Sequence, residues 1–269
     1  MLLGISSYTF PWAIINNENI GADKFSAQHL VQFASTNNIQ FVQFGDNLPL
    51  DKLNVSELAD LKDLATKNNI EIQTGARKLT LENIERFIEL SIFFGSPFIR
   101  MVIDDANFYP TPAEAIHIIQ QALPLLKKHN IILAIENHDR LTAVALKDII
   151  LKTDPQFVGI CLDTANSLGA GDTVQEVLNV LSPYTVNLHV KDIVIKRLDH
   201  KMGFIVEGVA AGDGAINIPK LVEQLEPTGR CKTATLELWL NPSNTMEETL
   251  QKEKEMVEKS IHYLKQILA

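Results

Sequence analysis

Four apolar segments of the sequence each carry, at or near their end, a side chain of a type that binds metal ions. The segments are 131–139, 158–166, 186–192 and 233–239, and the side chains are Glu136, Asp163, His189 and Glu237. Each segment has the length and β-branched content of a buried strand. A carboxylate or imidazole at the end of such a strand is costly to bury unless something binds it, so these four residues are candidate ligands.

The residue types of this set indicate an oxygen-rich metal site. Three carboxylates that meet at one place repel one another, and a cation between them removes that repulsion. One imidazole nitrogen together with carboxylate oxygens favours Mn²⁺ or Mg²⁺ and leaves Co²⁺ and Zn²⁺ open. If the four segments converge, the sequence predicts one divalent metal bound by Glu136, Asp163, His189 and Glu237.

Strand-like and helix-like segments alternate along the whole chain, and this alternation is what would position the ligands. The expected strands are 2–10, 40–44, 71–74 and 98–103, then the first three apolar segments above, then 233–240. The expected helices are 26–38, 55–67, 80–94, 111–128 (with a kink at Pro124), 144–152, 173–181, 218–225 and 246–268. Residues 193–216 interrupt the alternation and are expected to form an irregular or hairpin excursion.

Eight strand–helix pairs in about 250 residues predict an α/β fold, a single (β/α)8 TIM barrel in which residues 1–269 form one domain. An open, doubly wound sheet is the alternative. It is less consistent with the sequence, because no Gly-x-Gly-x-x-Gly turn follows the first strand and the polar tips recur on the last four strands. In a barrel the C-terminal ends of the strands meet at one mouth, which would bring the four ligands together.

The composition argues against several classes of function. A formal net charge of −9 disfavours a nucleic acid as partner, because such sites are built from Lys and Arg. No apolar run approaches the roughly 20 residues of a membrane span, and we expect neither a membrane segment nor a signal peptide. Two cysteines, Cys161 and Cys231, form no disulfide framework, so we expect a cytoplasmic protein with Cys161 in its core. A homo-oligomer is left open.

Five short motifs follow one another in the second half of the chain. They are Ile135-Glu-Asn-His138, Leu162-Asp-Thr-Ala-Asn166, His189-Val-Lys-Asp192, Gly212-Asp-Gly214 and Glu237-Leu-Trp239. The series resembles the xylose-isomerase-like TIM-barrel superfamily, which includes sugar and sugar-phosphate isomerases and epimerases, hydroxypyruvate isomerase, inosose dehydratase and AP endonucleases. In its ketose 3-epimerases the four matching residues bind Mn²⁺ or a similar cation. The resemblance implies that Glu136 and Glu237 also act as the acid/base pair, one on each face of the substrate.

The resemblance and the residue chemistry together predict a divalent-metal-dependent isomerase or epimerase of a small ketose, keto-acid or related sugar. A cation chelated by a carbonyl oxygen and a neighbouring hydroxyl stabilises the enediolate that forms when an α-proton leaves. A metal-dependent lyase on the same scaffold, an inosose-type dehydratase or a decarboxylase, would begin from the same species. A non-catalytic sugar-binding barrel is the third alternative. DNA repair is disfavoured by the acidic charge and by the scarcity of His in the first half.

Five further residues are candidate substrate contacts. Lys191 shares the face of His189 and would hold an oxyanion or carboxylate, or else pair with an acid at the rim. Arg100 would grip an anionic group or form a structural ion pair, and His138 would contact substrate or orient the ligands. Trp239 would stack on a sugar ring or fill the core. Asn166 stands where the epimerases usually carry His, a difference that weakens the transfer of their specific reaction.

Overall fold

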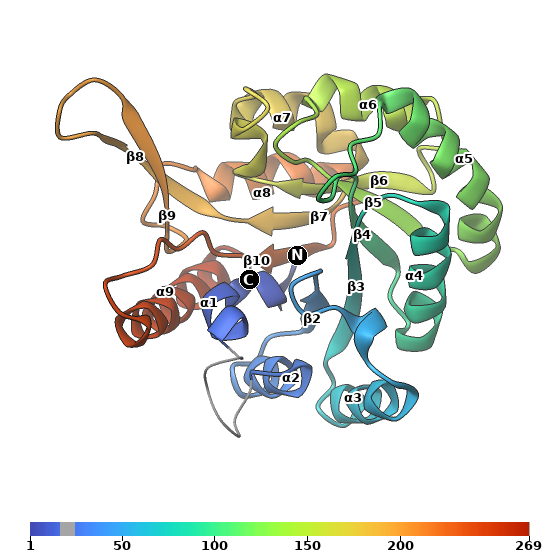
Figure 1. Ribbon diagram of the computed structural model, residues 1–269, viewed down its shortest axis with the longest axis horizontal. Coiled ribbons are helices and arrows are strands. Elements are labelled where there is room, and N and C mark those ends of the chain that lie inside the picture. The colour runs from blue at the N-terminus through green and yellow to red at the C-terminus, as the bar shows by residue number, and fades with distance from the viewer. Residues whose placement is uncertain (17–24, 269) are drawn as a thin grey trace.

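The computed structural model of the protein describes residues 1–16 and 25–268. Eight parallel strands close into a barrel in the order β1-β10-β7-β6-β5-β4-β3-β2, with helices around the outside (Figure 1). The strands are β1 (Leu2–Ser6), β2 (Phe41–Phe44), β3 (Glu71–Arg77), β4 (Phe98–Val102), β5 (Ile132–Glu136), β6 (Val158–Asp163), β7 (Thr185–Val190) and β10 (Thr233–Leu236). This arrangement confirms the predicted α/β fold, a single (β/α)8 TIM barrel.

The helices follow the strands as the alternation predicts, except that the first of them, over residues 11–15, was not expected. They are α1 (Pro11–Ile15), α2 (Ala27–Thr36), α3 (Val55–Lys67), α4 (Leu81–Phe94), α5 (Pro112–His129), α6 (Ala143–Leu151), α7 (Val174–Leu181), α8 (Ile218–Leu225) and α9 (Met246–Ile267). Several begin at a Thr or Asn side chain that accepts a hydrogen bond from the first turn, as Thr111 does from the N–H of Glu114. Helix α5 continues past Pro124 to His129, close to the expected end. None of the described helices is both long enough and apolar enough to span a bilayer.

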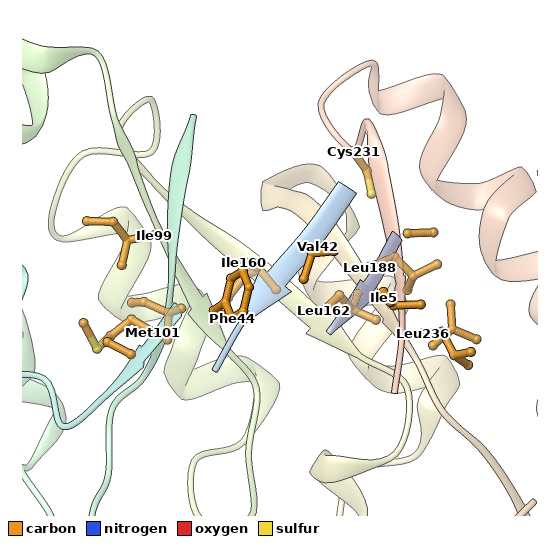
Figure 2. Packing of buried hydrophobic residues seen from close by; sticks show 14 of the residues in the cluster. Ile5, Val42, Phe44, Ile99, Met101, Ile160, Leu162, Leu188, Cys231 and Leu236 are labelled. Carbon is orange, nitrogen blue, oxygen red and sulfur yellow. The ribbon is translucent and has the colours of Figure 1, made fainter. Parts of the chain in front are cut away.

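The barrel strands separate apolar from polar side chains by their alternation. Outward residues such as Val42, Ile99 and Leu188 pack into the large core beneath the helices, as Figure 2 shows. A second, small cluster contains Phe98, Ala134, Cys161 and Val186. The first three share the parity of inward residues further along their strands, so this cluster fills the inside of the barrel below the mouth. The expectation that Cys161 belongs to the core is confirmed.

Several strand boundaries differ from the sequence-based ones, among them the ends of β1, β10 and β3. β1 ends at Ser6 instead of residue 10, because Ser6 and Thr9 cap a short 3-10 helix over Ser7–Thr9. β10 ends at Leu236 instead of residue 240, since the N–H of Leu238 turns away to the carbonyl of Tyr8 at 3.0 Å. β3 runs on to Arg77, three residues beyond the expected end. All three differences lie where the chain enters the mouth.

The excursion after β7 is a hairpin. β8 (Asp192–Arg197) and β9 (Phe204–Val209) pair antiparallel and extend away from the barrel (Figure 1). The Asp192 carboxylate anchors its base by accepting hydrogen bonds from the N–H groups of Ile193, Gly212, Gly214 and Ile216, at 2.9–3.1 Å. Gly208 packs so closely on Trp239 that a Cβ there would come within 1.7 Å of the Trp239 carbonyl oxygen. The hairpin is therefore fixed at the mouth.

Candidate metal centre at the barrel mouth

The four predicted metal ligands come together. Glu136 and Asp163 are the last residues of β5 and β6, His189 lies in β7, and Glu237 follows β10. The register pairs Asp163 with His189, and all four residues are at least 98% buried. One ligand atom each of Asp163, His189 and Glu237 lie within 4.8 Å of one another, and so do those of Glu136, Cys161 and His189. The thiol of Cys161 is thus a fifth candidate, which the sequence placed only in the core.

The imidazole of His189 points at the three carboxylates. Its Nδ1 lies 3.3 Å from Glu237 Oε1, 3.4 Å from Glu136 Oε2 and 3.9 Å from Asp163 Oδ2. No group in the described residues meets this buried nitrogen with hydrogen-bond geometry. An unpartnered nitrogen among carboxylate oxygens is unfavourable by itself, and it is the arrangement that a divalent cation would satisfy. The residues present therefore fit a metal ion.

Gln43 determines which nitrogen of His189 carries the proton. His189 Nε2 lies 2.6 Å from Gln43 Oε1, and the Gln43 amide is oriented by donating from Nε2 to Gln73 Oε1 and Asn187 Oδ1, at 3.2 and 3.3 Å. Because a carbonyl oxygen only accepts, His189 Nε2 is the donor. The lone pair then resides on Nδ1, as a metal ligand requires. Gln43 is not among the residues predicted from the sequence, and its inward place on β2 is the signal that marks it.

Two buried cations accompany the carboxylates. Lys191 Nζ donates to Asp163 Oδ2 at 2.5 Å and lies 2.9 Å from Glu237 Oε2, while Arg100 Nε donates to Glu136. Burial alone would lower the pKa of Lys191, but the Asp163 and Glu237 carboxylates outweigh it and raise the pKa above its ordinary value. The predicted Lys191 and Arg100 are thus both ion-paired to the ligand carboxylates.

The two glutamates are held in the ionised form. Burial by itself would raise the pKa of Glu237 and of Glu136, but the neighbouring positive charges outweigh it and lower both. Hydrogen bonds fix the carboxylates further: Ser6 Oγ donates to Glu237 Oε1 at 2.9 Å, and Asn166 Nδ2 donates to Glu136 Oε1 at 2.7 Å. Asn166, predicted as a substrate contact, therefore also positions a candidate ligand.

A further group of polar residues, not predicted from the sequence, lies beside Arg100. Asp46 Oδ1 accepts from Arg100 Nη1 at 3.2 Å, and its Oδ2 accepts from Tyr8 Oη and Arg77 Nε, each at 3.0 Å. Burial would raise the pKa of Asp46, but Arg100 and Arg77 lower it below its ordinary value. These residues follow β1 and β2 or end β3, so their position at strand ends was the available signal.

The other two predicted substrate contacts lie nearer the solvent. His138 Nδ1 lies 3.2 Å from Asp139 Oδ2, and its half-buried ring lines a small cavity together with Glu136 and Leu141. Trp239 is 36% exposed, and its ring centroid lies 5.7 Å from Lys191 Nζ. Both side chains are therefore placed between the ligand cluster and the outside.

The comparisons with known proteins agree with this fold. Residues 31–267 match the family model of the xylose isomerase-like TIM barrel, and the chain belongs to this family, as the motifs predicted. It is 27% identical over 264 residues to the 3-oxo-isoapionate decarboxylase of Pectobacterium atrosepticum, which covers 98% of this chain and 95% of the relative.

Two solved structures share the architecture. A D-psicose 3-epimerase crystallised with D-fructose superposes with a TM-score of 0.73 at 14% identity, covering 100% of this chain and 99% of that one. A xylose isomerase-like TIM barrel protein from Mycobacterium smegmatis in complex with magnesium gives 0.70 at 11% identity, covering 98% and 97%. At these identities the likeness concerns the fold. The family is one of enzymes whose characterised members include epimerases and decarboxylases.

Proposed function

We propose that this protein is a divalent-metal-dependent isomerase or epimerase of a small ketose, keto-acid or related sugar. The observation that carries the proposal is the buried, unpartnered Nδ1 of His189, which faces three carboxylates at the mouth of a family barrel. Glu136, Asp163, His189 and Glu237 would hold the cation, with Mn²⁺ or Mg²⁺ favoured by the oxygen-rich set and Co²⁺ or Zn²⁺ also suitable. One solved structure of this fold is in complex with magnesium and another has a bound zinc atom, which supports a divalent cation.

When bound, the cation would supply Lewis acidity that stabilises an enediolate of the substrate. Glu136 and Glu237 would move the protons. Both carboxylates have lowered pKa values, so both are ionised at neutral pH and either can accept an α-proton at an Oε atom. They come from β5 and from the end of β10, and each lies within 3.4 Å of the same His189 nitrogen. Lys191, Arg100, His138, Asn166 and Trp239 are the proposed substrate contacts.

A lyase, and specifically a decarboxylase of an oxo-acid, is the second candidate. It is favoured by the 27% identity with a 3-oxo-acid decarboxylase across nearly the whole of both chains. In that reaction the C–C bond to the carboxylate breaks and CO₂ leaves. The electron pair of the broken bond stays on the substrate and forms the enediolate, and one proton then returns to carbon. One acid suffices, so Asn166 in place of a titratable His costs this reaction less than it costs an epimerase.

The partner would be a small sugar or keto-acid, and neither a nucleic acid nor a membrane is expected as a binding partner. A cytoplasmic location is proposed from the presence of only two cysteines, and a homo-oligomer is left open. The expected partner follows from the acidic composition and the metal-site chemistry.

Metal content and two substitutions test the proposal. We expect elemental analysis of the purified protein to find about one divalent ion per chain, and His189→Ala to abolish it. Glu136→Gln should retain part of the metal and lose most turnover. A panel of ketoses and keto-acids in D₂O separates the reactions: an isomerase or epimerase incorporates deuterium next to the carbonyl without loss of CO₂ or water. The exposed Glu71→Gln is the control. Full activity of Glu136→Gln would remove its acid/base role.

A further inference from the structure

The hairpin of β8 and β9 concentrates exposed apolar side chains. Of the fifteen large apolar side chains that are exposed in the described residues, five lie within one short stretch: Ile195, Met202, Phe204, Ile205 and Val206. The hairpin extends away from the barrel as a separate two-stranded sheet (Figure 1). A two-stranded sheet is marginally stable in water unless one of its faces packs against another element. Its exposed apolar surface is therefore a candidate contact surface.

The strand register divides the hairpin into two faces of different polarity. Residues directly opposite each other share a face, and so do residues two apart in one strand. The exposed apolar residues of one face are Ile195, Phe204 and Val206, which are 58%, 59% and 41% exposed. The other face bears Ile205 and the ion pair of Lys196 with Glu207, which suits contact with water. The first face is the one that the described part of the chain leaves uncovered.

A groove on the barrel adjoins this apolar face. It has a volume of about 360 Å³, and Ile193 and Ile195 of the hairpin line it together with Val174 and Leu178 of α7 and Leu221 of α8. Protruding apolar side chains and an apolar groove therefore lie side by side on one part of the surface. Two copies related by a two-fold axis can each place a hairpin against the other's groove, as an isologous interface requires.

The charges of the two surfaces have opposite signs. The whole chain carries −9, so two copies repel each other over most of their surface. Residues 196–207 of the hairpin, in contrast, have three positive and two negative side chains and a net charge of +1. The helices beside the groove, α7 and α8, carry Glu176, Lys220 and Glu223, a net charge of −1. Contact of hairpin with groove therefore brings opposite charges together in an otherwise repulsive pair.

The two surfaces together have the size of a stable interface. Residues 195–206 and the residues that line the groove number 23, counting Ile195 once, and a standard interface has roughly 20–30 residues a side. We propose that two copies of this chain form a two-fold symmetric dimer, in which the apolar hairpin face of each copy packs against the groove of the other. This assembly does not depend on which reaction the mouth performs.

Sedimentation equilibrium of the purified protein measures the assembly. Between about 1 and 100 µM we expect a monomer–dimer equilibrium. Phe204→Asp places a charge in the apolar face and should weaken dimerisation at least about 30-fold, the effect of losing a central anchor of an interface. The matched control is Val55→Asp, at a position of α3 that is 84% exposed, and it should leave the dimer unchanged. Because both positions are exposed, both variants should keep the circular dichroism spectrum of the unmutated protein.

Two charge reversals test whether hairpin and groove meet. Arg197→Glu makes the end of the hairpin acidic and Glu223→Lys makes the side of the groove basic, so each variant alone should dimerise at least about tenfold more weakly. An equimolar mixture of the two variants should regain the affinity of the unmutated protein. In the mixed dimer, each hairpin again faces a groove of opposite charge.

Three results would overturn the proposal. A chain that stays monomeric at about 100 µM leaves the apolar face to a partner other than a second copy. A dimer that persists in Phe204→Asp uses a different surface. A mixture that associates no better than its two components means that the hairpin of one copy does not contact the groove of the other.

Discussion

Two buried carboxylates, Glu237 at the barrel mouth and Glu253 on α9, have the same exposure and opposite protonation behaviour. Glu237 is 2% exposed and Glu253 is 1% exposed. The pKa of Glu237 lies well below its ordinary value, because the neighbouring positive charges outweigh burial. Burial raises the pKa of Glu253 to about 7, although the N–H groups of Trp12 and Ala13 donate to it at 2.7 and 3.1 Å.

The difference shows that cationic partners, and not burial, decide whether a carboxylate here is available as a ligand or base. Two backbone N–H groups do not offset the desolvation of Glu253, whereas His189 first, and then Lys191 and Arg100, do so for Glu237. Glu253 joins α9 to the first turn of α1, which is a structural role. At the mouth, in contrast, the carboxylates stay charged because Lys191 and Arg100 are buried beside them.

The largest expected effect is on turnover. Glu237→Gln keeps an oxygen ligand but removes the group that takes up a proton, so with saturating metal we expect kcat to fall by roughly 100- to 10,000-fold. Steady-state kinetics on the substrate found in the panel measure it. Glu253→Gln, a change of the same kind at the other carboxylate, should leave kcat within about twofold. Equal losses in the two variants would contradict the contrast between the sites.

Removing a cation from the mouth should destabilise the fold strongly. Arg100→Met leaves Glu136 and Asp46 without their shared partner, and breaking a buried ion pair in this way costs about 3–5 kcal/mol. Urea unfolding monitored by circular dichroism measures the loss. Adding Glu136→Gln to Arg100→Met should recover part of it, because the unpaired charge disappears. Arg86→Met, at an exposed position of α4, should stay within about 0.5 kcal/mol.

Glu253 should make the free energy of unfolding depend on pH in the direction opposite to that expected for Glu136 and Glu237 at the mouth. Its pKa rises from 4.5 in the unfolded chain to about 7 in the fold, so the folded state binds more protons in that window. Stability should therefore fall as pH rises from about 4.5 through 7, by roughly 3 kcal/mol in total. Glu136 and Glu237, with lowered pKa values, instead lose their contribution as pH falls.

Glu253→Gln should remove that downward slope. Free energies of unfolding measured by urea titration at half-unit steps between pH 5 and 8 provide the test. The control is Glu258→Gln, an exposed position on the same helix, which should leave the slope as it is in the unmutated protein. An unchanged pH profile for Glu253→Gln would mean that the buried carboxylate is not the group that titrates.

The smallest effect should come from Gln43, which accepts a hydrogen bond from the His189 imidazole. Gln43→Met removes the acceptor that places the proton on Nε2 of His189, and loss of such a partner costs about 10- to 100-fold in metal affinity. Competition with a fluorescent chelator measures the affinity. Gln251→Met, on an exposed position of α9, is the matched control. An unchanged affinity in Gln43→Met would show that another group fixes the tautomer.

The site residues that could be predicted from the sequence are those where one segment holds both an apolar strand and a ligand-type side chain at its end. Glu136 and Asp163 end apolar runs, so their place at the mouth follows from strand polarity once eight strand–helix pairs are counted. It failed for Asp46, Tyr8 and Arg77, because their importance comes from pairing across three neighbouring strands. No local pattern shows that Asp46 bridges Arg77 and Arg100, which are 31 and 54 residues away in sequence.

The sequence by itself determined the barrel, the strands that build its mouth and the residue types gathered there, because alternation and hydrophobic periodicity are local properties. Tertiary structure decided the charge state of that mouth and the orientation of His189. Those depend on which distant side chains meet: Gln43 with His189, Lys191 with two carboxylates, and Arg100 with Glu136. Electrostatic energy depends on distance in space and on burial, and only the closed barrel sets both.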